Sequence, residues 1–137
     1  MLIAFILIVI HYVADFMAQT EEMALGKSKS FKILLKHTGI YTFIFYLAFA
    51  LWCIYQNHFG TITVQDMGWS PWLFLFFPII FVTHFIIDYV SSKITARKFE
   101  KKQYYTPIPN FGAFSIIGLD QVAHYGTLFL TYYILTK

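Results

Sequence analysis

The sequence predicts an all-α polytopic membrane protein, a bundle of four transmembrane helices forming a single domain over residues 1–137. Its composition, 58% hydrophobic and only 12% charged, is too apolar for a soluble domain of this size. The apolar residues fall into four stretches, each close to the roughly 20 residues that cross about 30 Å of hydrocarbon as a helix. No stretch alternates polar and apolar residues as a transmembrane strand would.

The four helices are expected at about residues 1–19, 38–56, 71–92 and 111–135. The first has neither a basic segment ahead of its apolar run nor a small-x-small cleavage site, so we expect it to be retained rather than removed as a signal peptide. The second contains Cys53, the single cysteine of the chain, which we expect to pack as a small apolar side chain. Two prolines and an asparagine in residues 103–112 predict a non-helical connector before the last helix.

The basic residues predict the orientation. Nine of the ten Lys and Arg residues fall after the first and third helices, and residues 57–70 contain none. The positive-inside rule therefore puts both basic segments in the cytoplasm and both termini outside it. Trp69 and Trp72 are expected at the outer interface, and His58 and Asp66 in a solvated outer loop. The basic segments are Lys27, Lys29, Lys32 and Lys36, then Lys93, Arg97, Lys98, Lys101 and Lys102.

Three polar motifs interrupt the apolar stretches: His11-x3-Asp15, His84-x3-Asp88 and the reversed Asp120-x3-His124. Residues four apart share one face of a helix. Ionisable groups inside a membrane cost roughly 2.5–3.5 kcal/mol each on insertion scales, so six of them require a common reason. Because the last helix runs in the opposite direction, the reversed order again puts Asp nearer the cytoplasm. The motifs therefore predict one site in the cytoplasmic half of the bilayer.

Three imidazoles and three carboxylates suit a divalent transition metal, zinc first, with manganese or iron as alternatives. An ion with one position open to water lowers the pKa of that water and generates a nucleophile. Asp15 or Asp88 could then act as general base instead of ligand. The predicted ligands are His11, Asp15, His84, Asp88, Asp120 and His124, and the residues expected to support them or to contact substrate are Gln19, His37, Lys93 and Gln121.

Two other interpretations use the same residues. The His–Asp pairs could clamp the helices together, although hydrogen bonds between membrane helices average only about 0.6 kcal/mol. They could also form a path for protons or cations, which intramembrane acids and histidines often mark.

The sequence also carries a family resemblance. The segments HYVADFMAQ (11–19), THFIIDYVSSK (83–93) and LDQVAH (119–124), together with His37, resemble a family of small bacterial and phage membrane proteins catalogued as domain of unknown function 3307. The likeness covers essentially the whole chain. It implies a multi-pass protein of the bacterial inner membrane and no established activity. The chain is more distantly similar to inner-membrane proteins described as metal-dependent hydrolases.

These observations together predict a membrane hydrolase that uses an intramembrane metal site to cleave a lipid or another membrane-associated ester, amide or phosphoester. The alternatives are a proton or metal-ion transporter or channel using the same residues, and a non-catalytic factor of the cell envelope. The expected partners are membrane lipids, including a lipid substrate. No nucleic acid is expected, and no particular oligomeric state is implied.

Overall fold

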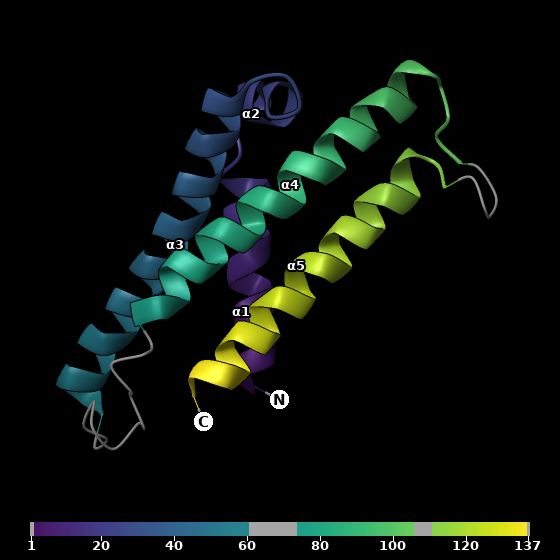
Figure 1. Cartoon of the computed structure of the whole chain (residues 1–137). Helices are drawn as coiled ribbons and strands as arrows, with labels where there is room; N and C mark the ends of the chain where they lie inside the picture. Colours follow the sequence, from purple (N-terminus) through teal and green to yellow (C-terminus); the bar gives the residue numbers. More distant parts are fainter. Residues whose placement is uncertain (1, 61–73, 106–110, 137) are drawn as a thin grey trace.

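A computed structural model describes residues 2–60, 74–105 and 111–136, and within these ranges all regular structure is helical. Figure 1 shows the helices in chain order. The expectation of an all-α chain is confirmed. The elements are α1 (Leu2–Tyr12), a π-helical turn η1 (Val13–Met17), α2 (Glu21–Gly26), α3 (Phe31–Phe59), α4 (Phe76–Glu100) and α5 (Ala113–Leu135).

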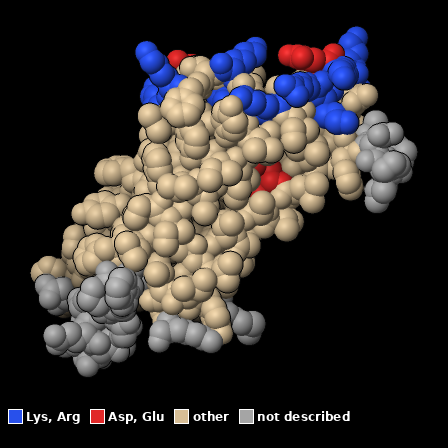
Figure 2. All heavy atoms as spheres, in the orientation of Figure 1, with Lys and Arg blue, Asp and Glu red and all other residues tan. Residues whose placement is uncertain are grey.

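The four long helical segments pack in a closed circuit. Helices α4 and α5 run antiparallel and side by side, α3 packs against α4, and α1 contacts both α3 and α5. Both ends of the chain lie at one end of the molecule, and α2 lies at the other (Figure 1). Lys and Arg side chains crowd at the α2 end, as Figure 2 shows. The helices therefore enclose one interior. One end of the molecule, the basic end, carries the Lys and Arg side chains, and the other, the terminal end, carries both ends of the chain.

Two helices are long and apolar enough to span a membrane, over Phe31–Gln56 and Phe76–Glu100, and Leu2–Met17 is a shorter apolar helix. Only 17% of the apolar window of each longer helix is buried inside the protein, whereas the core helix of a soluble protein would be mostly buried. Large apolar side chains are exposed on every long helix, among them Phe5, Phe43, Val82 and Leu130. Soluble proteins rarely expose continuous apolar surface of this kind. These features indicate membrane association.

Several helix boundaries differ from those expected. Helix α3 begins at Phe31, seven residues before the expected start at 38. Its first two turns are amphipathic: Leu34 is buried while Lys32 and Lys36 are exposed, so a search for continuous apolar residues misses them. His37, which would precede a helix that starts at 38, therefore lies inside α3.

Helix α4 begins at Phe76 and continues past the expected end at 92. It ends in a Schellman arrangement in which Lys102 has a positive φ of 55° and the Gln103 N–H donates to the Lys98 carbonyl at 2.9 Å. The basic segment 93–100 is therefore helix rather than loop.

The short helix α2 is absent from the sequence prediction. The Thr20 side chain accepts a hydrogen bond from the Met23 N–H at 3.3 Å, and Glu21 and Glu22 occupy the first turn, where acids favour a helix N-terminus. Three residues with expected positions lie outside the described residues: Asp66, Trp69 and Trp72. So do residues 71–73, where the third helix is expected to begin.

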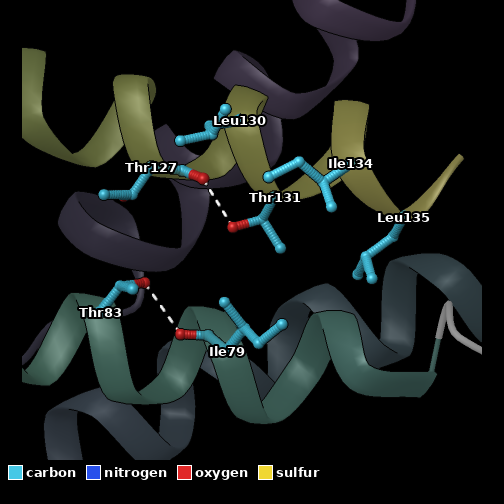
Figure 3. Close-up of a pocket in the computed structure, with 7 residues that line it drawn as sticks. All are labelled: Ile79, Thr83, Thr127, Leu130, Thr131, Ile134 and Leu135. Atoms are coloured by element: carbon cyan, nitrogen blue, oxygen red, sulfur yellow. Dashed lines mark hydrogen bonds between the residues drawn. The ribbon is translucent and has the colours of Figure 1, made fainter. Parts of the chain in front are cut away.

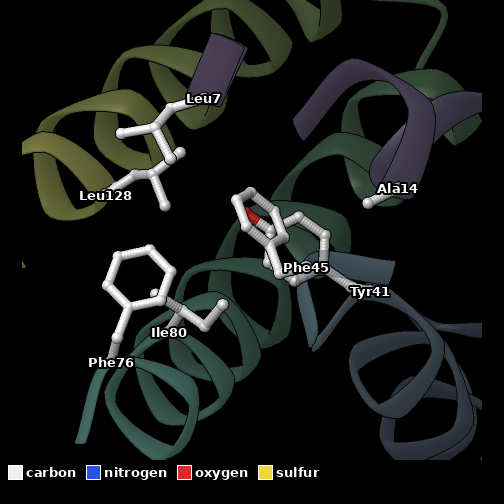
Figure 4. Packing of buried hydrophobic residues seen from close by; sticks show 7 residues of the cluster. All are labelled: Leu7, Ala14, Tyr41, Phe45, Phe76, Ile80 and Leu128. Atoms are coloured by element: carbon white, nitrogen blue, oxygen red, sulfur yellow. The ribbon is translucent and has the colours of Figure 1, made fainter. Parts of the chain in front are cut away.

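The apolar core lies in the half of the molecule nearer the termini. Figure 4 shows its buried side chains, which come from all four long segments: Leu7, Ala14, Tyr41, Phe45, Phe76, Ile80 and Leu128. Four of them each lie one helical turn from a histidine of the same helix, in the pairs Leu7 and His11, Tyr41 and His37, Ile80 and His84, and Leu128 and His124. This spacing stacks a layer of imidazoles directly on the apolar core.

Candidate metal centre

Each long helix contributes one buried histidine to this layer. His11, His37, His84 and His124 are all at most 2% exposed. The centroid of the His84 ring lies 5.2 Å from that of His37 and 4.4 Å from that of His124. The centroids of the His11 and His124 rings are 5.3 Å apart. Sequence reasoning placed His37 beside the ligands, whereas the structure places it in the middle of the layer. The position of His37 along its helix is the feature that could have indicated this, because His37 lies on α3 at the level of the other three histidines.

Carboxylates form the next layer toward the basic end. Asp15 and Asp88 are 3% and 1% exposed, and Asp120 is partly buried. Each lies four residues from the histidine of its own motif, so one helical turn separates the two layers. Asp15 belongs to the π turn η1, a widened turn of a kind that often occurs at functional sites. The three motifs therefore meet in one polar interior, as the sequence predicted.

Four donor atoms converge at the centre of this interior. The Nε2 atom of His37 lies 3.1 Å from Asp15 Oδ1, 3.0 Å from Asp88 Oδ2 and 3.1 Å from His84 Nε2. His84 Nε2 lies 3.7 Å from the same Asp15 oxygen and 3.4 Å from the same Asp88 oxygen. Bonds of about 2.0–2.2 Å to a tetrahedral ion place its ligand atoms about 3.3–3.6 Å apart. The four donors thus have nearly the spacing of a tetrahedral metal site.

Hydrogen bonds alone cannot satisfy these four potential metal-ligand atoms. An imidazole Nε2 carries at most one hydrogen, yet that of His37 faces two carboxylate oxygens and a second ring nitrogen within 3.1 Å. A cation among the four atoms would accept a lone pair from each of them and would offset the cost of burying the carboxylates. This buried cluster of Asp15, His37, His84 and Asp88 could therefore hold a metal ion.

A second set of candidate ligands adjoins the first and shares Asp88 with it. Asp88, Asp120 and His124 offer donor atoms that all lie within 4.8 Å of one another. Asp120 accepts hydrogen bonds from the Ser91 hydroxyl at 2.6 Å and from the Gln121 amide at 3.1 Å. Polar neighbours thus hold this carboxylate in place.

Lys27 is the residue at this site that sequence reasoning missed. Its ammonium group donates to both oxygens of Asp88, at 3.2 and 3.1 Å, and its side chain is 16% exposed. Lys27 follows α2, and only the packing of α2 against α3 brings it over α4. No motif in the sequence distinguishes it from the other lysines of its segment. In the metal-free protein it supplies the positive charge next to Asp88.

The other predicted residues take different positions. His11 contacts the Tyr41 hydroxyl and the Gln121 amide oxygen, each at 3.0 Å, and belongs to neither donor set. Gln121 also donates to Asp15 at 3.2 Å, so it links the two motifs. The Gln19 amide oxygen is buried and has no hydrogen-bond partner among the described residues. Lys93 does not reach the cluster, because its ammonium group lies over the ring of the exposed Tyr89, 3.5 Å from the centroid.

An apolar pocket of about 260 Å³ lies between α4 and α5, on the terminal side of the histidine layer. Figure 3 shows its lining, in which the hydroxyls of Thr83 and Thr131 donate to carbonyls of their own helices. Most of the exposed lining is apolar. Thr83 and Thr127 also line a smaller recess that includes His84 and His124. Thr83 and Thr127 therefore lie between the pocket and the two imidazoles.

The fold and the site define a helical, membrane-associated protein with a buried His/Asp cluster that could hold a metal ion. The chain belongs to the family described as "Protein of unknown function (DUF3307)", whose model matches residues 3–137. No curated protein and no solved structure matches it. The more distant resemblance to metal-dependent hydrolases stays a prediction.

Proposed function

We propose that this chain is a single-domain, four-span protein of the bacterial inner membrane that uses a divalent transition ion, zinc first, to hydrolyse a lipid or another membrane-associated substrate. The observation that carries the proposal is the near-tetrahedral set of four buried donors, His37, His84, Asp15 and Asp88. Burying two carboxylates and two imidazoles in an apolar helical protein is costly unless they bind a cation.

The arrangement of the helices supports the membrane part of the proposal. At 1.5 Å per residue, α3, α4 and α5 are each longer than about 30 Å, enough to cross the hydrocarbon, and α1 with η1 reaches about 24 Å. A span this short is accommodated by local thinning of the bilayer. All four segments run between the basic end and the terminal end (Figures 1 and 2). The basic end would face the cytoplasm, and both termini would face outward.

A reporter fusion tests this orientation. A reporter that is active only outside the cytoplasm should be active when fused after Lys137. The same reporter fused after Lys102, at the basic end, should be silent. The reverse pattern would contradict the proposed orientation, and activity at both positions would contradict a crossing of the membrane by α5, the helix between the two fusion points.

The pocket between α4 and α5 supports a substrate with a hydrocarbon chain. Its lining is apolar and it opens at a helix surface that would face lipid. A chain lying there would have its polar end near Thr83 and Thr127, beside the recess lined by His84 and His124. A substrate dissolved in the bilayer could thus enter sideways.

A bound ion would supply Lewis acidity and lower the pKa of a water at the site. Hydrolysis adds the oxygen of that water to the acyl carbon or phosphorus and transfers a proton to the departing oxygen or nitrogen. Asp120, which lies outside the four-donor set, would accept the proton of the water through an oxygen that is not bound to metal. Lys27, which is partly exposed at the cytoplasmic side of the cluster, would contact an anionic group of the substrate.

One observation favours the transporter alternative. Polar contacts run without interruption from Tyr41 through His11, Gln121, Asp15 and His37 to Asp88, and on to the partly exposed Lys27. On the terminal side, however, the buried layer next to the histidines is mainly apolar, with Leu7, Ile80 and Leu128 among its members (Figure 4). A polar chain that ends on an apolar layer suits a site reached from one side better than a path across the membrane.

Metal content tests the proposed site. Protein purified in detergent should contain a transition ion in at least equimolar amount. His84→Gln should remove this ion and lower hydrolysis of a panel of lipid carboxyl and phosphate esters at least about a hundredfold, because it removes a direct ligand. The matched control is His58→Gln, a change at the exposed end of α3, which should retain metal and activity. Wild-type protein without metal after loading with Zn²⁺, Mn²⁺ or Fe²⁺ would contradict the proposal.

A further inference from the structure

The geometry points to a second cation position, formed by Asp88, Asp120 and His124, so that Asp88 bridges two ions. This inference rests on the proposed function, because it concerns the same interior and assigns its reactive position. The two donor sets have only Asp88 in common, and the donors of each set lie within 4.8 Å of one another.

The two donor sets differ in coordination. The set of Asp15, His37, His84 and Asp88 fills all four positions of a tetrahedral ion with buried protein atoms. Structural metal sites are closed in this way, whereas catalytic sites have three protein ligands and one position for water or substrate. With the first position alone, one of the four ligands would have to leave the ion before water could bind to it. The second set has three protein ligands and so leaves that place open.

The surroundings of His124 also favour a cation at this position. Its Nδ1 atom lies 2.9 Å from the Asp120 backbone carbonyl and 3.5 Å from an Asp120 carboxylate oxygen. Both oxygens are acceptors, so Nδ1 carries the hydrogen and Nε2 has a lone pair. That Nε2 atom is buried and has no hydrogen-bond partner among the described residues, although the side chain is only 1% exposed. A buried imidazole nitrogen without a partner is costly, and a cation would satisfy it. A backbone carbonyl commonly orients a metal-binding histidine in this manner.

The two positions also differ in exposure. Asp120 is the most exposed carboxylate of the cluster, with an 11% exposed side chain, compared with 4% for Asp15 and 1% for Asp88. It lies between α4 and α5, where the Ser91 hydroxyl holds it from the facing helix. His124 also lines a recess that shares Thr83 and Thr127 with the apolar pocket. The second position is therefore the more exposed of the two.

The charges indicate what such a centre would bind. Three carboxylates and one ammonium, with neutral imidazoles, carry a net charge of about −2, which one divalent ion balances. A second ion leaves a net positive charge of about the same size in a site of low dielectric. An anionic substrate would balance it, and pairs of ions about 3.5–4 Å apart are the usual arrangement for cleaving phosphate esters. We therefore expect a lipid phosphate ester to be a better substrate than a neutral ester.

Metal stoichiometry tests the second position. The full-length protein in detergent is stripped with chelator, loaded with Zn²⁺ alone, separated from free ion, and assayed for zinc per chain. Wild type should retain two ions. Asp120→Asn and His124→Gln should each retain one, because they leave the four-donor set intact. The matched control Glu100→Gln, which neutralises an exposed acid at the end of α4, should retain two. Helical circular dichroism and elution volume identify any variant that has failed to fold.

The outcomes separate this inference from the proposed function. Wild type with one ion, unchanged by Asp120→Asn and by His124→Gln, would overturn the second position and leave the first standing. Wild type with no ion would overturn both. Two ions that both survive in Asp120→Asn and His124→Gln would show that the second ion binds elsewhere. Two ions in wild type and one in both variants would establish the position.

Discussion

Asp88→Asn is expected to abolish binding of both ions and to lower hydrolysis at least about a hundredfold. The Asp88 carboxylate belongs to both donor sets and lies 3.0 Å from His37, 3.4 Å from His84 and 3.1 Å from Lys27. The change preserves the shape of the side chain but removes the charge that every cation at the site would meet. Zinc per chain and hydrolysis rate, measured on the same preparation, give the result.

The stability of Asp88→Asn distinguishes a metal centre from a structural clamp. If the cluster only held the helices together, neutralising one buried acid would be tolerated or even stabilising, because it lowers the cost of burial. If the cluster binds metal, the variant loses the stabilisation that saturating ion gives the wild type, about 2.7 kcal/mol at a hundredfold excess over Kd. A variant with normal activity and an unfolding midpoint at or above that of metal-loaded wild type would contradict the metal centre.

Lys27→Met is expected to destabilise the metal-free protein by about 3 kcal/mol, the lower end of the range for breaking a buried ion pair. The lower end applies because the Lys27 side chain is 16% exposed, whereas that of Asp88 is 1% exposed. Methionine retains most of the apolar stem, so the lost charge dominates the effect. Thermal unfolding of stripped protein measures it.

Added Zn²⁺ should reverse most of this loss, because the ion replaces the missing positive charge next to Asp88. The matched control is Lys29→Met, an exposed residue of the same segment, for which we expect a change within about 0.5 kcal/mol. Equal destabilisation of the stripped and the zinc-loaded Lys27→Met protein would indicate that Lys27 acts as a packing residue and not as a counter-ion.

Part of the site could be predicted because it depends on helix periodicity alone. The three His/Asp motifs have a spacing of four, which puts each pair on one face, and their order reverses in the helix that runs the opposite way. This order puts each Asp nearer the basic end than its His, and the structure does bring the three motifs into one interior. The same reasoning gave no preference among the six residues as ligands.

The helix ends could be predicted less well because they are not apolar. The first turns of α3 and the last turns of α4 present lysines to one side, so hydropathy gives no sign of where these helices stop. The extension of α3 explains why His37 lies within a helix, one turn from Tyr41, and stacks with the other imidazoles. The π turn at Asp15 likewise has no clear sequence signature.

By itself, the sequence determined the all-helical class, the concentration of basic residues at one end, and the presence of polar motifs on helix faces, because composition and periodicity are properties of each segment alone. Only the tertiary structure decided that His37 and not His11 joins Asp15, His84 and Asp88 in the four-donor set, that Asp88 is shared with Asp120 and His124, and that Lys27 contacts it. These assignments depend on the rotation of each helix about its axis and on how α2 packs, which are set by contacts between segments distant in sequence. A rotation of one residue, about 100° on an α-helix, would exchange one set of ligands for another.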